Sequence, residues 1–443
     1  MKRVPKVLCM YYFKVTFTFC VALIIVVSGC NSLLFKQHIQ TMIYPTFADW
    51  CVNKTNLSSS TRHTIEVMLR ELDTTDCVKA SKKLSSRAEL SIDGEQITDI
   101  SPLSSLTNLK KLSLSVNEIS DISPLSSLTN LTILNLDCNN KISDITPLKH
   151  LTNLTELALF GNQISDIAPL KDLTKLTVLN LRYNQIKSLN NLNNLNNLNK
   201  LSLTDNQVSN VNPLKSLTNL TYLSLDANKI FDITPLQFLK KLKSLYLHKN
   251  QILDISPLKS LTNLNTLFIY KNQISDISPL QFLTDLTTLY IYENQISDIS
   301  SLRFMTKLTE VDLGHNNIFN INMLSGINLT FLDLTNNHTS DVRSLKFMTT
   351  LTVLSLADNQ VSDISSLKSL TKLTELYLSE NQISDVSELK SLTSLRRLDL
   401  ANNRISDISM LKSLIHILEA YLEGNPLTDR NCPWGYDFRC RYE

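Results

Sequence analysis

The sequence predicts an α/β repeat solenoid, a horseshoe of about sixteen 22-residue turns with a parallel concave sheet, short 3₁₀ turns on the convex side and a cap at each end. Three observations support this prediction. An asparagine recurs at an almost constant interval, leucines alternate with variable residues before it, and only 7 of the 443 residues are glycine. Such scarce glycine fits one repeated corner better than varied loops. The hydrophobic content of 43% argues against disorder.

The repeating unit has the consensus L-x-x-L-x-L-x-x-N-x-I-x-D-I-x-P-L-x-x-L-T-x, which is a leucine-rich repeat. Alternation in Leu-x-Leu predicts a strand with leucines inward, and stacked strands bury a continuous core. We assign the asparagine to the bend after each strand, because its amide both donates and accepts hydrogen bonds. The predicted asparagine ladder occupies positions 117, 140, 162, 184, 206, 228, 250, 272, 294, 316, 337, 359, 381, 403 and 425, with Glu95 in the same place one period earlier.

The Asp-Ile-x-Pro-Leu half of each unit is expected on the convex side. Aspartates such as Asp99 and Asp121 precede a short turn, where a carboxylate accepts hydrogen bonds from exposed N–H groups. Prolines such as Pro102 and Pro124 suit the first position of that turn, whose N–H needs no partner. The regular aspartates are therefore assigned to the scaffold and not to catalysis.

The N-terminus is predicted to direct export. Residues 1–29 contain four bases and no acid, and residues 15–27 form an apolar run shorter than the ~20 residues of a membrane-spanning helix. The segment Val27-Ser28-Gly29-Cys30 resembles the bacterial lipobox, which implies cleavage before Cys30, acylation of Cys30 and a membrane-anchored lipoprotein in the cell envelope. Without the signal the chain has 39 bases and 41 acids, and this near-neutral balance excludes a nucleic-acid-binding protein.

The predicted organisation is a signal peptide (1–29), a tether (30–43), an N-terminal cap (44–86), leucine-rich repeats (87–428) and a C-terminal cap (429–443). Residues 60–72 are expected to form an amphipathic helix in the N-terminal cap. Cys51 and Cys77 flank this helix, and Cys432 and Cys440 lie near the C-terminus. Neither pair has zinc-site spacing, so we expect two disulfides and no metal. Cys138, inside a repeat, is expected to be a buried free thiol.

The concave side carries the predicted ligand-binding site. Positions three, five and seven of Leu-x-x-Leu-x-Leu-x-x-Asn alternate with buried leucines and therefore face the concave side. Three consecutive repeats have rings at two of these positions: Tyr246, Phe268 and Tyr290 at position five, and His248, Tyr270 and Tyr292 at position seven. Exposed aromatic patches mark interaction sites. Aromatic pairs also stabilise sheets, so a purely structural role for these rings is the alternative.

The repeats, above all residues 272–280 (NQISDISPL) and their copies, closely resemble those of the internalins, surface proteins of Gram-positive bacteria. They are also similar to the leucine-rich regulatory subunit of protein phosphatase 1. The resemblance covers residues 87–428 and implies a monomeric module that binds a protein or glycan on its concave face. An intracellular scaffold similar to the phosphatase regulator is the alternative. The sequence has no HExxH, GxSxG or phosphate-loop motif, so neither an enzyme nor a cofactor is predicted.

Overall fold

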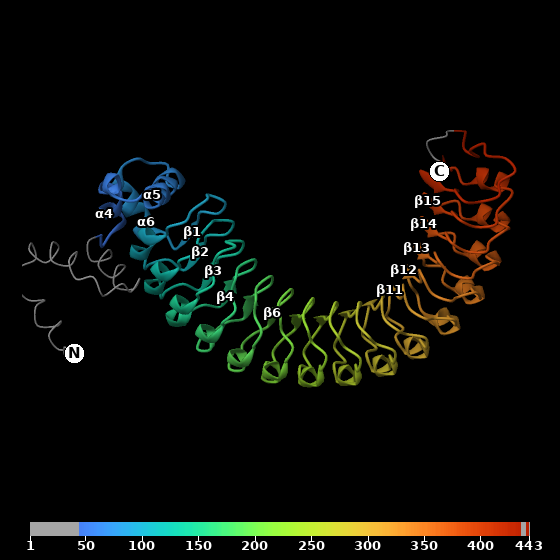
Figure 1. Cartoon of the computed structure of the whole chain (residues 1–443), viewed down its shortest axis with the longest axis horizontal. Helices are drawn as coiled ribbons and strands as arrows, with labels where there is room; N and C mark the ends of the chain where they lie inside the picture. Colours follow the sequence, from blue (N-terminus) through green and yellow to red (C-terminus); the bar gives the residue numbers. More distant parts are fainter. Residues whose placement is uncertain (1–43, 436–439, 443) are drawn as a thin grey trace, which may run out of the picture.

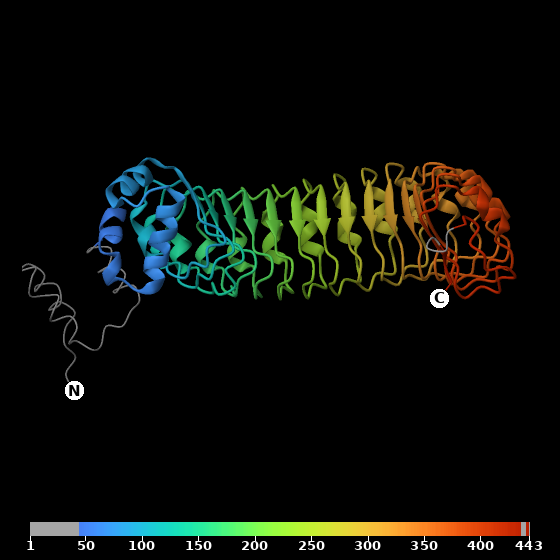
Figure 2. The ribbon, with the colours of Figure 1, turned by 90° about the horizontal axis from the view of Figure 1, so that it is seen from above.

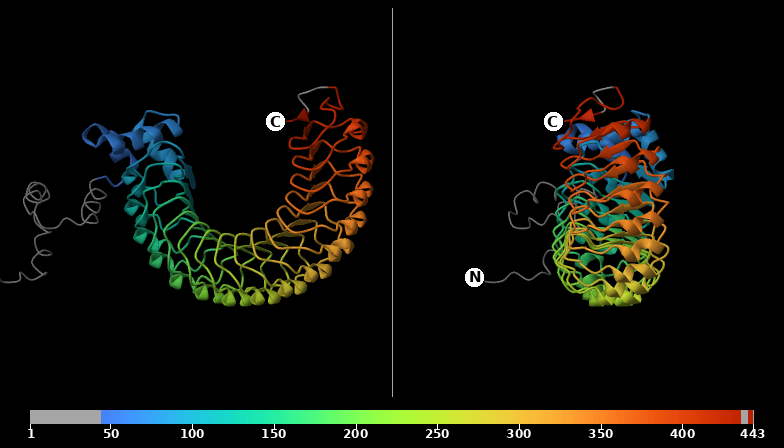
Figure 3. Two further views of the ribbon diagram at one scale, coloured as in Figure 1. Left: turned by 45° about the vertical axis from the view of Figure 1, so that its right-hand side comes forward. Right: turned by 90° about the vertical axis from the view of Figure 1, so that its right-hand side faces the viewer.

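The computed structural model describes residues 44–435 and 440–442, so Cys30, the predicted signal and the predicted tether lie outside the described residues. The described residues form an open arc (Figure 1). Strands line its inner, concave side and 3₁₀ segments line its outer, convex side, as the turned views in Figures 2 and 3 also show. This arrangement confirms the predicted leucine-rich repeat horseshoe.

The concave sheet contains seventeen parallel strands among the described residues. Each strand pairs with the strand that follows it in the sequence, without a register shift between repeats. The strands are β1 (Glu89–Ser91), β2 (Lys111–Ser113), β3 (Ile133–Asn135), β4 (Glu156–Ala158), β5 (Val178–Asn180), β6 (Lys200–Ser202), β7 (Tyr222–Ser224), β8 (Ser244–Tyr246), β9 (Thr266–Phe268), β10 (Thr288–Tyr290), β11 (Glu310–Asp312), β12 (Phe331–Asp333), β13 (Val353–Ser355), β14 (Glu375–Tyr377), β15 (Arg397–Asp399), β16 (Glu419–Tyr421) and β17 (Cys440–Arg441).

The core is a continuous column of leucine and isoleucine between the sheet and the convex segments. In the repeat around β10, for example, Leu286, Leu289 and Ile291 are fully buried. Burying each such side chain contributes roughly 1.5–3 kcal/mol. One repeat cannot cover its own apolar face, so each turn of the solenoid depends on its neighbours.

The asparagine ladder ends each strand and links neighbouring repeats. The amide nitrogen of Asn294 donates to the carbonyl oxygens of Ile269 (3.2 Å) and Ile291 (3.0 Å), one in each of two repeats. Its amide oxygen accepts from the N–H of Ile274 at 3.0 Å. The residue before it, Glu293, has a φ of 50°, a left-handed conformation that costs roughly 1 kcal/mol outside glycine. The side-chain hydrogen bonds hold this corner without glycine.

One position of the predicted ladder is wrong. The structure places Asn139, and not Asn140, in the ladder: Asn139 is 1% exposed and its amide oxygen accepts from the N–H of Ile119 at 3.1 Å. Asn140 is exposed and has a φ of 62°, so the extra residue of this repeat follows the ladder asparagine. The repeat keeps the regular spacing from strand to asparagine and accommodates its extra residue just after the asparagine.

The convex side consists of short 3₁₀ segments, as predicted. Before η11, Asp276 accepts the N–H of Ser278 at 2.8 Å, and Pro279 occupies the second position of the segment. The segments are η3 (Ser101–Ser105), η4 (Ser123–Ser127), η5 (Thr146–His150), η6 (Ala168–Leu170), η7 (Asn190–Leu192), η8 (Asn212–Ser216), η9 (Thr234–Phe238), η10 (Ser256–Ser260), η11 (Ser278–Phe282), η12 (Ser300–Phe304), η13 (Asn322–Gly326), η14 (Arg343–Phe347), η15 (Ser365–Ser369), η16 (Ser387–Ser391) and η17 (Ser409–Ser413).

Three α-helices cover the first repeat: α4 (Phe47–Val52), α5 (Ser59–Glu71) and α6 (Cys77–Ser86), with the 3₁₀ segment η2 (Lys54–Asn56) between the first two. Helix α5 corresponds to the predicted amphipathic helix, and Ile65, Met68, Leu69 and Leu72 are buried. Thr64 in α5 donates its hydroxyl to the carbonyl oxygen of Asp99 at 2.6 Å, which fastens the helix to the repeats. The disulfide Cys51–Cys77, with a Cα–Cα distance of 5.5 Å, joins α4 to α6.

The C-terminal end is closed by a strand that the sequence did not predict. Strand β17 adds to β16, and the disulfide Cys432–Cys440 links it back to the chain that follows the last repeat. The indole N–H of Trp434 donates to the carbonyl oxygen of Leu411 at 3.1 Å. Cys138 is a free thiol, as expected, but it is half-buried and not buried, because it stands at the left-handed corner before Asn139 with a φ of 56°.

Candidate functional site

The structure brings all six predicted ring residues together on the concave sheet. Strands β8, β9 and β10 align Tyr246, Phe268 and Tyr290 in one row. The phenylalanine ring meets Tyr246 edge-on, with ring centroids 5.1 Å apart, and it stacks on Tyr290 at 4.5 Å with an angle of 2° between the planes. All three side chains are half-buried, because each ring covers part of its neighbour.

A second row runs beside the first, just beyond the strands. The ring of Tyr270 lies between the rings of His248 and Tyr292, with centroid distances of 4.2 Å and 4.1 Å. The angles between the ring planes are 12° and 11°, so the three rings form one parallel stack along the solenoid. We call these residues the ring stack. Their ring edges, and not their faces, point across the arc.

Two further aromatic residues extend the first row, and the sequence reasoning missed both. Tyr222 on β7 packs against Tyr246, with ring centroids 5.3 Å apart, and Phe331 on β12 approaches Tyr290 at 6.1 Å. Both occupy position three, which also faces the concave side, so scanning that position for rings would have found them. We define the aromatic patch as Tyr222, Tyr246, His248, Phe268, Tyr270, Tyr290, Tyr292 and Phe331.

Burial raises the pKa of four tyrosines in the patch. It raises the pKa of Tyr246, Tyr270 and Tyr290 above the usual range, and the pKa of Tyr292 rises further because burial is joined by its hydrogen bond with Tyr270. At neutral pH these phenols are therefore protonated. The surface combines ring edges with hydroxyl groups that both donate and accept, a combination typical of interface tyrosines.

A buried polar network closes the ring stack at one end. Asp226, at position seven of the preceding repeat, is 4% exposed, and its Oδ1 lies 2.7 Å from Nδ1 of His248. Its other oxygen accepts from the hydroxyls of Ser224 (2.9 Å) and Thr204 (3.3 Å). These contacts hold the imidazole against Tyr270, so this end of the stack is occupied by protein.

An acidic notch lies at the other end of the ring stack. It is a hollow of about 220 Å³ lined by Tyr292, Glu293, Asp312, Gly314, His315, Asp333 and Thr335. Burial is the main cause that raises the pKa of Asp312 to about 7, and the neighbouring charge of Asp333 adds to it. The Asp312 carboxyl is therefore held in a setting that disfavours its negative charge.

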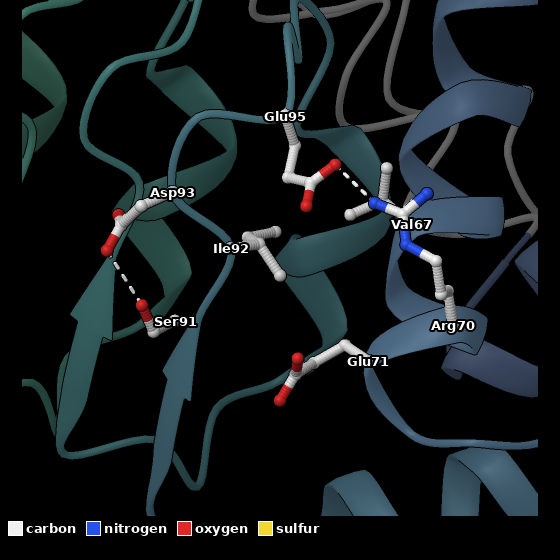
Figure 4. Close-up of a pocket in the computed structure, with 7 residues that line it drawn as sticks. All are labelled: Val67, Arg70, Glu71, Ser91, Ile92, Asp93 and Glu95. Carbon is white, nitrogen blue, oxygen red and sulfur yellow. Dashed lines mark hydrogen bonds and ion pairs between the residues drawn. The ribbon is translucent and has the colours of Figure 1, made fainter.

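A second hollow lies where α5 meets β1, at the N-terminal end (Figure 4). Arg70 on α5 forms an ion pair with Glu95, and Ser91 donates its hydroxyl to Asp93 at 2.8 Å. The ion pair joins α5 to the first repeat and the hydrogen bond lies within that repeat, and we assign both to the scaffold. In the part of the chain that the structure describes, no three His, Cys, Asp or Glu side chains are placed to hold a metal ion. None of the described helices combines the length and apolarity needed to cross a bilayer.

Comparison with known proteins places this geometry in context. The family model of leucine-rich repeats (two copies) matches residues 107–150, 152–194, 240–282, 284–326, 327–369, 349–391 and 371–413. The chain is 35% identical to the internalin InlF from Listeria monocytogenes, with a TM-score of 0.59 over 86% of this chain and 96% of that chain. Comparison with curated proteins finds no match.

Two other solved structures are similar. A leucine-rich repeat protein from Leptospira interrogans is 25% identical, with a TM-score of 0.73 over 80% of this chain and 94% of that chain. The functional domain of InlJ from Listeria monocytogenes, which includes a cysteine ladder, shares the fold at 23% identity, with a TM-score of 0.70 over 85% of this chain and 80% of that chain.

Proposed function

Because the chain belongs to the internalin-like leucine-rich repeat proteins, we propose that it is an exported, lipid-anchored bacterial protein that binds a protein or glycan through its concave face. The aromatic patch is the observation that carries this proposal. Its rings form a continuous surface across repeats β7 to β12, in the middle of the arc. Buried aromatic anchors dominate binding energy at protein interfaces.

The alternative explanation, that the rings only stabilise the sheet, accounts for part of their arrangement. Cross-strand aromatic pairs contribute roughly 0.2–1 kcal/mol each. The leucine core already holds every repeat, however, and most other repeats have small or polar residues such as Ser202, Ser355 and Ala357 at the same positions. Grouping the rings in adjacent repeats favours recognition, because a stabilising role would be served equally well anywhere along the arc.

Export is supported by the disulfides at the two ends of the described chain. Disulfides persist in oxidising compartments and are rare in the reducing cytosol, so they favour an extracytoplasmic protein over an intracellular phosphatase-regulator-like scaffold. The predicted signal peptide and the lipobox-like segment that ends at Cys30 support a lipid anchor on the mature N-terminus.

Affinity capture tests the proposed binding surface. The mature chain is used as bait, and Phe268, Tyr270, Tyr290 and Tyr292 are replaced together by serine. We expect the variant to lose its captured partner while its far-UV circular dichroism is kept and its Tm falls modestly. The matched control changes Tyr377 and Tyr421 to serine, since both occupy position five outside the aromatic patch. Undiminished capture by the folded quadruple variant would place the site elsewhere on the solenoid.

A further inference from the structure

The two ends of the ring stack differ in one respect that bears on the partner. At one end the neighbouring residue in position seven is Asp226, which contacts His248. At the other end that neighbour is Gly314, which has no side chain to cover the ring of Tyr292. One face of Tyr292 lies against Tyr270, and the opposite face therefore opens into the acidic notch.

The floor of the notch offers acceptors in fixed positions. Oδ1 of Asp312 accepts the N–H of Gly314 at 3.0 Å, and Oδ1 of Asp333 accepts the N–H of Thr335 at 2.7 Å. These backbone hydrogen bonds orient both carboxylates. Among the described residues, no hydrogen bond to Oδ2 of either aspartate competes for those atoms. A Cβ on Gly314 would lie 3.4 Å from Asp312 Oδ1 and 3.6 Å from Asp333 Oδ1, so both acids border the space left by the missing side chain.

Among the described residues, those that line the notch include one imidazole, that of His315, and neither lysine nor arginine. From Asp226 to Ala357, positions three, five and seven hold the acids Asp226, Glu310, Asp312 and Asp333 and neither lysine nor arginine. Lys271, which precedes the ladder asparagine of the β9 repeat, is paired with Glu293 at 2.9 Å. A cationic ligand group would supply a positive charge that no lysine or arginine in the notch lining provides.

We propose that the acidic notch binds an arginine side chain of a protein partner, with the guanidinium stacked on the open face of Tyr292 and hydrogen-bonded to Asp312 and Asp333. This inference rests on the proposed function and names the chemistry of the partner. A guanidinium is planar, stacks on aromatic rings and presents a fork of donors that matches carboxylates. A neutral sugar meets the ring but leaves the carboxylates uncompensated, so charge complementarity favours a protein over a glycan.

The same geometry distinguishes arginine from lysine. An ammonium group is a strongly hydrated point charge that gains less from lying flat on a ring. The open face of Tyr292 and the carboxylates of Asp312 and Asp333 line the same notch. One guanidinium group stacks on the ring and donates hydrogen bonds to both carboxylates at the same time. Continuing the ring stack by one more planar group also fills the gap that Gly314 leaves between the repeats of β10 and β12.

Small amides of single amino acids test the proposal without the unknown partner. N-acetylarginine amide, N-acetyllysine amide and N-acetylcitrulline amide are titrated against the mature protein by saturation-transfer NMR. We expect the arginine amide to bind about tenfold more tightly than the lysine amide, and the neutral citrulline amide to show no saturable binding. Equal binding of the three amides, or tighter binding of the citrulline amide, would overturn the proposal. If Ca²⁺, added as millimolar CaCl₂, displaces the arginine amide and binds more tightly than it, the notch is a metal site and the proposal is overturned.

Two variants locate the binding. Asp312→Asn combined with Asp333→Asn removes the charge but keeps the shape, and we expect at least a tenfold loss of arginine-amide affinity. Gly314→Tyr places a ring in the notch and extends the ring stack, so the variant should fold and lose the arginine amide as well. The matched controls are Asp399→Asn and Ala357→Tyr, which occupy positions five and seven in other repeats. Unchanged affinity in both notch variants would show that the amide binds elsewhere.

Failure of this inference is distinguishable from failure of the proposed function. If the aromatic quadruple variant loses its captured partner but the wild-type protein does not prefer the arginine amide, the concave face remains the binding surface and the arginine assignment falls. If the arginine amide binds at the notch while the quadruple variant, which also lacks the Tyr292 ring, still captures the partner, the notch binds a guanidinium but neither the notch nor the aromatic patch is the partner's contact.

Discussion

The side chain of Asn139 reaches back to the preceding repeat and donates to the carbonyl oxygen of Leu114 at 3.1 Å. It also donates to the carbonyl oxygen of Leu136 in its own repeat at 3.0 Å. Asn294 shows the same pattern, since it donates to a carbonyl oxygen in the preceding repeat and to one in its own repeat. Each of these amides, buried as at Asn139 or half-buried as at Asn294, therefore satisfies backbone groups in two repeats.

Replacing Asn139 with alanine should destabilise the protein strongly. The change leaves the N–H of Ile119 without its side-chain partner, whereas the carbonyl oxygens of Leu114 and Leu136 each lose one of two side-chain donors and keep Asn117 and Asn162. An orphaned buried N–H costs roughly 1–3 kcal/mol and each lost hydrogen bond about 0.5–1.5 kcal/mol, so we expect a loss of about 2–4 kcal/mol in the free energy of unfolding. Urea denaturation followed by circular dichroism measures this difference.

The control for this prediction is the neighbouring asparagine. Asn140 is exposed and has a φ of 62°, which glycine adopts without strain. Asn140→Gly should therefore change the free energy of unfolding by less than about 0.5 kcal/mol. A larger loss for Asn140→Gly than for Asn139→Ala would contradict the assignment of Asn139 to the ladder.

The fold was predictable because its signal is repeated in every turn. Strand, asparagine corner, aspartate and 3₁₀ segment each recur in the sequence, so one irregular copy hardly affects the assignment. The error at Asn140 arose where two asparagines stand side by side, and the consensus spacing from Leu136 would have selected Asn139. Strand β17 could not be predicted, because its pairing depends on the chain returning after Cys432 and not on any periodic pattern.

The candidate site was only partly predictable. Alternation with buried leucines identified the concave columns and the six rings. The stacking angles and the open face of Tyr292 depend on rotamers that no pattern specifies. The pKa of Asp312, raised to about 7, depends on burial and on the nearby charge of Asp333, and the sequence alone shows only that both acids occupy position five of their repeats.

The disulfides give a second prediction. Non-reducing peptide mapping of the exported protein should find the links Cys51–Cys77 and Cys432–Cys440 and a free Cys138. Breaking the first link with Cys51→Ser and Cys77→Ser should cost about 3 kcal/mol, since it releases a long loop in the unfolded chain. Free thiols at all five cysteines would instead indicate a reducing compartment.

The lipid anchor gives a third prediction. Cys30 follows the predicted secretory signal in a lipobox-like segment, so we expect mass spectrometry to find an acylated Cys30 at the mature N-terminus. Cys30→Ala should release the protein from the membrane fraction, because the substitution removes the thiol that would carry the lipid anchor. An intact Met1 terminus, or unchanged membrane retention of Cys30→Ala, would refute the anchor.

A fourth prediction concerns the pH dependence of stability at the acidic notch. Burial raises the pKa of Asp312 to about 7 in the folded protein, against 3.8 as its ordinary value. Between about pH 4 and pH 7 the folded state therefore holds a proton that the unfolded chain has released, so stability falls as pH rises. Asp312→Asn removes this titration and keeps an acceptor for the N–H of Gly314.

We expect Asp312→Asn to match the wild-type protein at pH 4 and to be more stable by on the order of 1–2 kcal/mol at pH 8, measured by urea denaturation across that range. The charged or titratable groups around Asp312 are Tyr290, Tyr292, Glu293, Glu310, His315 and Asp333. Asp399→Asn is the control, since Asp399 also accepts a backbone N–H, from Ala401 at 3.0 Å, but has Tyr377 and Tyr421 as neighbours at position five. A stability gain for Asp312→Asn that is constant from pH 4 to pH 8 would mean that the charge of Asp312 is not its cause.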